Sequence, residues 1–253
     1  MQVPAIAHRS LLLPLLAGLS ALAWALLWLW SSSPYGVFLD HSRMRELCLS
    51  AGPFGVANLF VAGWMLMTAA MMLPTTFIVL EMFRRLTLQR DDQPLLITLL
   101  ILGYLAVWLA FGVLAHAADW LLLDLLDRLQ PGVDERVVGA GLLLLAGAFQ
   151  FSTLKDRCLK QCRSPLGFVT HYWRTQGGRG GAFLLGVRHG AYCVGCCWAL
   201  MLLMFAVGAG NLGWMLALGV VMAVEKNLVW GRRLSPVVGV ALLLSGGWAA
   251  IAG

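Results

Sequence analysis

The stretch LLITLLILGYLAVWLAFGVLAHA, residues 95–117, contains no Asp, Glu, Lys or Arg. As a helix it rises about 34 Å, which is enough to cross the ~30 Å hydrocarbon core of a bilayer. Other long apolar stretches cover residues 10–30, 57–80, 137–154, 183–209, 212–230 and 234–252. None of them sustains the alternation of apolar and polar residues that barrel strands show. We therefore expect an all-α fold, a polytopic bundle of about seven transmembrane helices.

The composition excludes a water-soluble domain. Of the 253 residues, 60% are hydrophobic and 12% are charged, whereas soluble domains carry about 25% charged residues. The net charge of +6 does not indicate nucleic acid binding, because the basic residues lie in short segments between apolar runs and not on one basic face. We expect a single integral membrane domain over residues 1–253 that contacts the lipid bilayer and no nucleic acid.

The distribution of basic residues predicts the orientation. With seven spans and a cytoplasmic N-terminus, four of the 18 Lys and Arg residues lie outside and the other 14 inside; the four are Arg43, Arg45, Arg128 and Arg136. Cytoplasmic loops carry an excess of Lys and Arg, so we expect an N-in, C-out topology with a basic inner loop at 155–181. The first run is longer than the apolar region of a signal peptide, and we expect a retained helix.

Five of the six cysteines fall at or near the inner side, and Cys48 lies alone outside. The five are Cys158, Cys162, Cys193, Cys196 and Cys197. Cytoplasmic thiols stay reduced, so the even count does not indicate disulfides. Cys158 and Cys162 share a face if the fourth helix continues past Lys155, and the other three combine i+3 and i+4 spacing.

Thiolates at these spacings can converge on one soft metal ion, and copper(I) and zinc both accept them. The alternative is that the cysteines are small apolar side chains that allow close helix packing. The nearby cations Lys155, Lys160 and Arg188 favour thiolates and so add weight to a metal site. His189, one turn before Cys193, is a candidate nitrogen ligand.

Methionines provide a second set of candidate ligands. Met67 and Met71 share a face of the second apolar run, and Met201 and Met204 follow the cysteines of the fifth. Neutral thioethers bind copper(I) in preference to harder ions, so these four could line weaker sites deeper in the membrane, although methionine also fills gaps in apolar cores. In the second run, Pro74 predicts a kink and a freed backbone carbonyl.

Ionisable residues in or beside membrane spans are functional candidates by default. Lys155 ends the fourth run, Glu81 ends the second, and the pair Glu225-Lys226 ends the sixth. For Glu81 and Lys226 we favour interfacial snorkelling or a structural ion pair.

Several motifs together resemble one family. They are Ala70-Met71-Met72-Leu73-Pro74, Gly103-Tyr104 with Trp108, Gln150 followed by Lys155-x2-Cys158-x3-Cys162-Arg163-Ser164-Pro165, Tyr192-Cys193-x2-Cys196-Cys197-Trp198-x2-Met201, and Glu225-Lys226. Over roughly residues 60–230 the chain resembles the bacterial predicted metal-binding integral membrane proteins, a domain of unknown function. The resemblance implies a metal-binding, multi-pass protein of the cell inner membrane and assigns no reaction. Gln150, Lys155, Glu225 and Lys226 are then polar support for the site, and the helices 10–30 and 234–252 flank the family-like core.

Three functions are compatible with these features. The one we favour is a protein that binds, delivers or transports a soft ion, copper(I) before zinc, and exchanges it with a metallochaperone or a partner membrane protein. The second is a membrane oxidoreductase or monooxygenase-like component with a copper centre, against which the five dispersed His residues count. The third is a structural or assembly protein whose cysteines serve packing. The residues leave open whether the protein is an enzyme.

Overall fold

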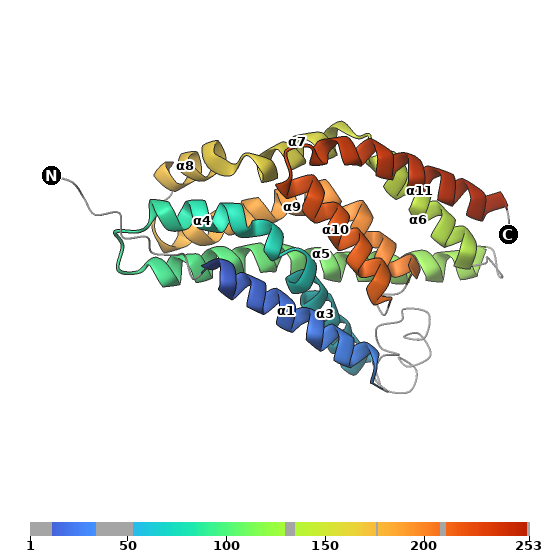
Figure 1. Ribbon diagram of the computed structural model, residues 1–253. Coiled ribbons are helices and arrows are strands. Elements are labelled where there is room, and N and C mark those ends of the chain that lie inside the picture. Colours follow the sequence, from blue (N-terminus) through green and yellow to red (C-terminus); the bar gives the residue numbers. More distant parts are fainter. Residues whose placement is uncertain (1–11, 34–52, 130–134, 176, 208–210, 252–253) are drawn as a thin grey trace.

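A computed structural model describes residues 12–33, 53–129, 135–175, 177–207 and 211–251 (Figure 1). Every regular element in these ranges is a helix, which confirms the all-α class. The α-helices are α1 (Leu12–Ser31), α3 (Pro53–Met71), α4 (Phe77–Leu86), α5 (Gln93–Leu129), α6 (Glu135–Phe149), α7 (Thr153–Arg163), α8 (Pro165–Thr175), α9 (Arg179–Val207), α10 (Leu212–Asn227) and α11 (Leu234–Ile251), and the short 3-10 helices are η2 (Pro74–Thr76) and η3 (Gly231–Arg233).

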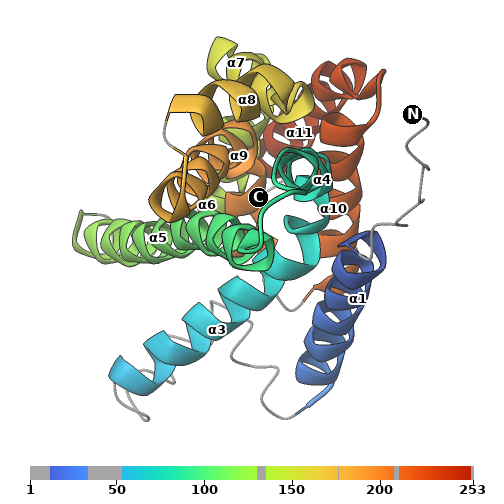
Figure 2. The ribbon, with the colours of Figure 1, turned by 90° about the vertical axis from the view of Figure 1, so that its left-hand side faces the viewer.

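Helices α5 and α9 run side by side along the length of the molecule (Figures 1 and 2). A Cβ added at Gly186 of α9 would meet the carbonyl oxygen of Leu100 and lie 3.0 Å from the amide nitrogen of Tyr104. One added at Gly103 of α5 would meet the carbonyl oxygen of Phe183. Small residues at a crossing let two helix backbones approach closely. This crossing sets Tyr104 of α5 beside the cysteine-bearing turns of α9.

The second predicted span is broken at Pro74, where the two helical segments meet at 46°. Proline donates no backbone hydrogen bond and ends the regular ladder. The carbonyl groups before it therefore take side-chain donors: the hydroxyls of Thr75 and Thr76 donate to the carbonyls of Met72 and Leu73, both at 2.7 Å. The predicted kink is present, and it leaves the backbone of Met72 outside a regular helix.

The fourth predicted span is broken as well, and α6 and α7 meet at 65°. Ser152 caps the new helix, since its hydroxyl accepts from the amide of Lys155 at 3.1 Å. Cys158 and Cys162 do lie on one helix, but this helix is α7 and not a continuation of α6. The segment 155–181, expected as a loop, instead contains most of α7 and all of α8. The prediction of a long loop there was wrong, because α8 buries Phe168 and Val169 in the apolar core.

Among the described residues, four helices are long and apolar enough to cross a bilayer, over Leu13–Ser31, Gln93–Leu126, Arg179–Met204 and Gly231–Ile251, and the two bent pairs bring the number to as many as six. Helix α5 continues to Leu129, well past the predicted end at 117. Helix α10 has 16 residues, a rise of about 24 Å. The seven-span, N-in, C-out topology stays a prediction.

Candidate metal centre

The three cysteines of α9 are buried inside the bundle, each 1% exposed. The thiols of Cys196 and Cys197 donate to the carbonyl oxygen of Cys193 at 3.1 and 2.9 Å, as their i+3 and i+4 spacing allows. The Cys193 thiol lies 3.2 Å from the hydroxyl of Tyr104. That hydroxyl also donates to the carbonyl oxygen of Met72 at 3.3 Å. One tyrosine therefore joins the cysteines to the break at Pro74.

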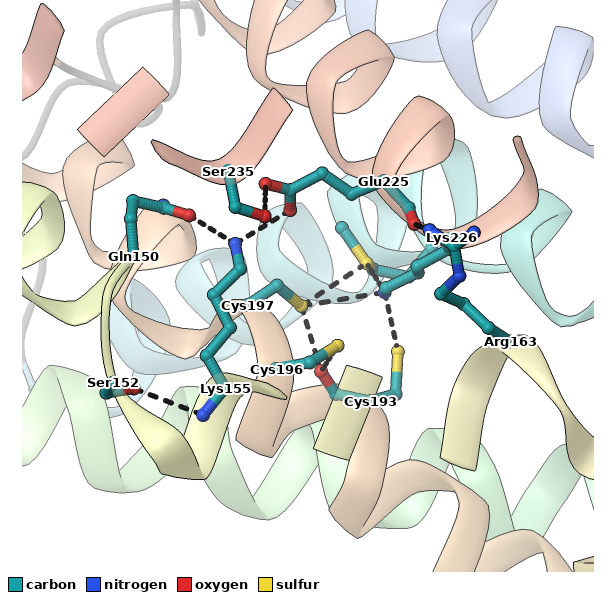
Figure 3. A network of polar contacts seen from close by, with 11 residues as sticks. Gln150, Ser152, Lys155, Arg163, Cys193, Cys196, Cys197, Glu225, Lys226 and Ser235 are labelled. Carbon is teal, nitrogen blue, oxygen red and sulfur yellow. Dashed lines mark hydrogen bonds and ion pairs between the residues drawn. The ribbon is translucent and has the colours of Figure 1, made fainter. Parts of the chain in front are cut away.

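Lys226 brings a positive charge to these sulfurs (Figure 3). Its Nζ lies 3.0 Å from Cys193 Sγ, 3.6 Å from Cys197 Sγ and 3.4 Å from Met72 Sδ. The sulfurs of Cys197 and Met72 are 4.0 Å apart. Of the two roles expected for Lys226, snorkelling to the interface is wrong, because the side chain is only 4% exposed and points into the bundle. The structural ion pair stays a prediction. We call Cys193, Cys197 and Met72 the sulfur triad.

Helix α7 packs along α9 and carries Cys158 and Cys162 on its buried face. A Cβ added at Gly195 of α9 would lie 2.6 Å from Cys158 Sγ, so the bare backbone at this position makes room for the α7 thiol. The structure therefore brings the two cysteine groups together. Cys158 and Cys162 are buried as well, at 8% and 7% exposed, against 1% for each of the α9 cysteines.

A polar cluster lies beside the sulfur triad (Figure 3). Lys155 Nζ forms an ion pair with Glu225 Oε2 at 2.7 Å, and the two side chains are 1% and 2% exposed. Lys155 also donates to Gln150 Oε1, and the hydroxyl of Ser235 donates to Glu225 Oε1 at 2.7 Å. Both carboxylate oxygens thus have a donor, as a buried ion pair requires. The lysine–glutamate cluster (Gln150, Lys155, Glu225, Ser235) ties the α6–α7 break to α10 and α11.

Arg163 fixes the end of α10 from α7. Its two terminal nitrogens donate to the backbone carbonyls of Glu225 at 2.9 Å and Val229 at 2.7 Å. The last carbonyls of a helix have no partner within it, and here a guanidinium supplies one. Because Arg163 follows Cys162 and Glu225 precedes Lys226, this contact holds the α7 thiols and the lysine in register.

The remaining predicted ligands are buried near the site. His189 is 3% exposed and its ring stacks on Tyr104, with centroids 5.5 Å apart. The predicted methionines lie in the same apolar cluster as the cysteines; they are Met67, Met71, Met201 and Met204. Met71 packs against Gly219 of α10. For His189 and these four methionines a ligand role stays a prediction. Glu81 is ion-paired with Arg84 and Arg85, at 2.8 Å each.

Cysteine, histidine and carboxylate side chains by themselves do not complete a metal site, since no three of them among the described residues converge on one point. The sulfur triad instead combines two thiols with one thioether, and soft donors of this kind select copper(I) over harder ions. Around an ion with metal–sulfur bonds near 2.3 Å, two sulfurs lie about 4 Å apart. The 4.0 Å between Cys197 Sγ and Met72 Sδ matches this separation.

Comparison with known families supports a role with copper. The model of the family PpoB2, described as a copper chaperone, matches residues 61–249. The chain belongs to this copper chaperone family. The match contains every residue of the sulfur triad, the α7 thiols and the lysine–glutamate cluster, and it leaves out α1. No curated protein matches the chain, and neither does a solved structure.

Two residues of this candidate site were not among the predicted ligands. Met72 stands beside the predicted Met71 but contacts the thiols only because the chain breaks at Pro74. Tyr104 reaches Cys193 only because glycines let α5 and α9 approach closely. Both stand in the motifs of the family resemblance. Ser235 stands in none of them and is an isolated serine at the start of an apolar run.

Proposed function

We propose that the protein is a copper(I) chaperone of the bacterial inner membrane, which holds the ion at the sulfur triad and passes it on by exchange of sulfur ligands. The observation that carries this proposal is the position of Lys226 Nζ, within 3.0–3.6 Å of all three triad sulfurs. Three sulfurs within 3.6 Å of one point converge there, and thiol and thioether donors select copper(I) over harder ions. The family match supports copper, and the long apolar helices support the membrane.

Lys226 acts in this proposal as the counter-charge of the loaded site. Copper(I) bound by two thiolates carries one net negative charge, and a buried charge is costly unless it is compensated. Lysine has a flexible four-carbon stem, so its ammonium can leave the centre of the triad and remain beside the anionic complex. The copper ion is cargo here, and Lys226 is the positioning residue that makes its buried site neutral.

The α7 thiols provide the route to the triad. Cys158 and Cys162 are more exposed than the α9 cysteines, and the helix that carries them packs along α9, with Cys158 Sγ against Gly195. We infer that copper(I) passes from a metallochaperone or partner membrane protein to these two thiols, and then by way of Cys196 to Cys193 and Cys197. Each step exchanges one sulfur ligand for another: the incoming thiol gives up its proton as it binds copper, the thiolate that leaves takes up a proton, and the oxidation states of copper and sulfur do not change.

Anaerobic loading with copper(I), followed by removal of loosely bound metal and elemental analysis, tests the site. We expect the wild type to retain about one ion per chain and the double variant Cys193→Ser, Cys197→Ser to retain none. Cys48→Ser is the matched control, since Cys48 has no part in the proposal. A double variant that retains as much copper as the wild type would refute the site. A wild type that retains zinc but no copper would refute the choice of ion.

The route is tested separately, by the rate of loading. The variant Cys158→Ser, Cys162→Ser keeps the triad, so we expect it to reach the copper content of the wild type but more slowly from a copper(I)–glutathione complex. Equal loading rates in stopped-flow measurements would eliminate the α7 thiols as the route and leave the triad standing.

A further inference from the structure

A basic pocket lies on the surface between the second half of α7 and the turn that follows α10, with a volume of about 310 Å³. Its lining carries three cations, Lys160, Arg163 and Arg232, and one carboxylate, Asp156. Asp156 is already paired with Arg232 at 2.8 Å. The guanidinium of Arg163 is held in place by its two backbone carbonyl acceptors. The pocket therefore has an excess of positive charge, and one of its cations, Arg163, is held in place.

Exposed apolar side chains lie beside these cations. Val229 lines the pocket and is 94% exposed, and its neighbours Leu228 and Trp230 are 40% and 54% exposed. All three lie between the end of α10 and η3. A free anion would contact the cations alone, whereas an amphiphilic ligand would contact the cations with its charged headgroup and the apolar side chains with its apolar part. Tryptophan and basic residues together at helix ends are typical of the membrane interface.

We infer that this pocket binds the phosphate headgroup of an anionic phospholipid, with the first part of its acyl chains against Val229 and Trp230. The inference rests on the proposed membrane location and does not depend on any copper ligand. A lipid bound here contacts α7 and the turn after α10 together. It therefore bridges the two segments that carry Cys162 and Lys226.

The test uses the purified, delipidated full-length protein in a mild non-ionic detergent. Native mass spectrometry measures retention of phosphatidylglycerol against phosphatidylcholine with the same acyl chains. We expect the wild type to prefer phosphatidylglycerol about tenfold, and the double variant Lys160→Ser, Arg232→Ser to lose most of this preference. The matched control is Arg157→Ser, Arg233→Ser, which removes the same charge from the same two segments but outside the pocket lining.

Two further arms separate the ligand classes. Val229→Ser keeps every charge, and we expect it to weaken phosphatidylglycerol binding without changing the weak binding of inorganic phosphate. Millimolar inorganic phosphate or glycerol phosphate should leave the lipid in place. If the pocket variant and the control variant lost the preference for phosphatidylglycerol equally, the cause would be the total charge of the protein, and the pocket assignment would be overturned. Displacement of the lipid by free phosphate, or full binding by Val229→Ser, would overturn the lipid assignment, and copper retention in the same samples reports separately on the proposed function.

Discussion

Replacing Lys155 by methionine should destabilise the fold strongly, because it leaves Glu225 with its charge buried. Lys155 and Glu225 are 2.7 Å apart and at most 2% exposed. At an effective dielectric constant of about 20, the attraction between two such charges is about 6 kcal/mol. Removal of one partner of a buried pair costs about 3–5 kcal/mol. Ser235 still donates to the carboxylate, so we expect the lower end, about 3 kcal/mol, or roughly a hundredfold in the folded-to-unfolded ratio.

The assay is reversible unfolding in mixed micelles, followed by tryptophan fluorescence as the fraction of denaturing detergent rises. Lys160→Met is the matched control: it removes the same residue type from the same helix, but Lys160 is exposed, and we expect a change within about 0.5 kcal/mol. Glu225→Gln and the double variant complete a double-mutant cycle. A coupling free energy of at least about 1 kcal/mol is expected for residues in contact. Additive effects, or equal effects of Lys155→Met and Lys160→Met, would refute the argument.

Three other predictions follow from the same geometry. Lys226→Met should weaken copper(I) binding about tenfold or more in an anaerobic chelator competition, since the loaded triad loses its counter-charge; unchanged or tighter binding would show that the lysine only competes with the ion. Tyr104→Phe removes one buried hydrogen-bond donor and should lower the free energy of unfolding by about 1 kcal/mol in the same micelle assay. An unchanged free energy of unfolding would count against the contact to Cys193. Gly186→Ala should cost about 1–3 kcal/mol by forcing α5 and α9 apart, whereas Gly180→Ala, which has open space, should be neutral or slightly stabilising.

The sequence predicted the helical class and the grouping of the cysteines because both depend on local rules. Apolar run length identifies a membrane helix, and i+3 and i+4 spacing places Cys193, Cys196 and Cys197 within about one turn. Lys226 could not be placed in this way, because its contact with Cys193 joins residues 33 positions apart and depends on how α10 packs. The start of α7 could have been predicted from Ser152, because serine just before a charged helical segment is a favoured N-cap.

The methionines show the same division between local and tertiary information. Periodicity pairs Met67 with Met71 on one helix face, but only the packing of α3 decides which face meets another helix. Met71 meets Gly219 of α10, while Met72 meets the thiols because Pro74 ends the helix there. Helical periodicity does not apply to a residue at a helix break. The contacts of such a residue depend on the tertiary packing and cannot be predicted from spacing along the sequence.

The 16 residues of α10 have a consequence for the lipid around the protein. If α10 crosses the bilayer, as its apolar run predicts, its rise of about 24 Å falls about 6 Å short of a 30 Å hydrocarbon core. Such hydrophobic mismatch is relieved by local thinning of the bilayer, at a fraction of a kcal/mol per ångström. The last turn of α10 carries Glu225 and Lys226, so the strain of a thick bilayer would then fall on the turn that supplies the proposed counter-charge. The acyl-chain length of the lipid would thereby affect the proposed copper site from outside the protein.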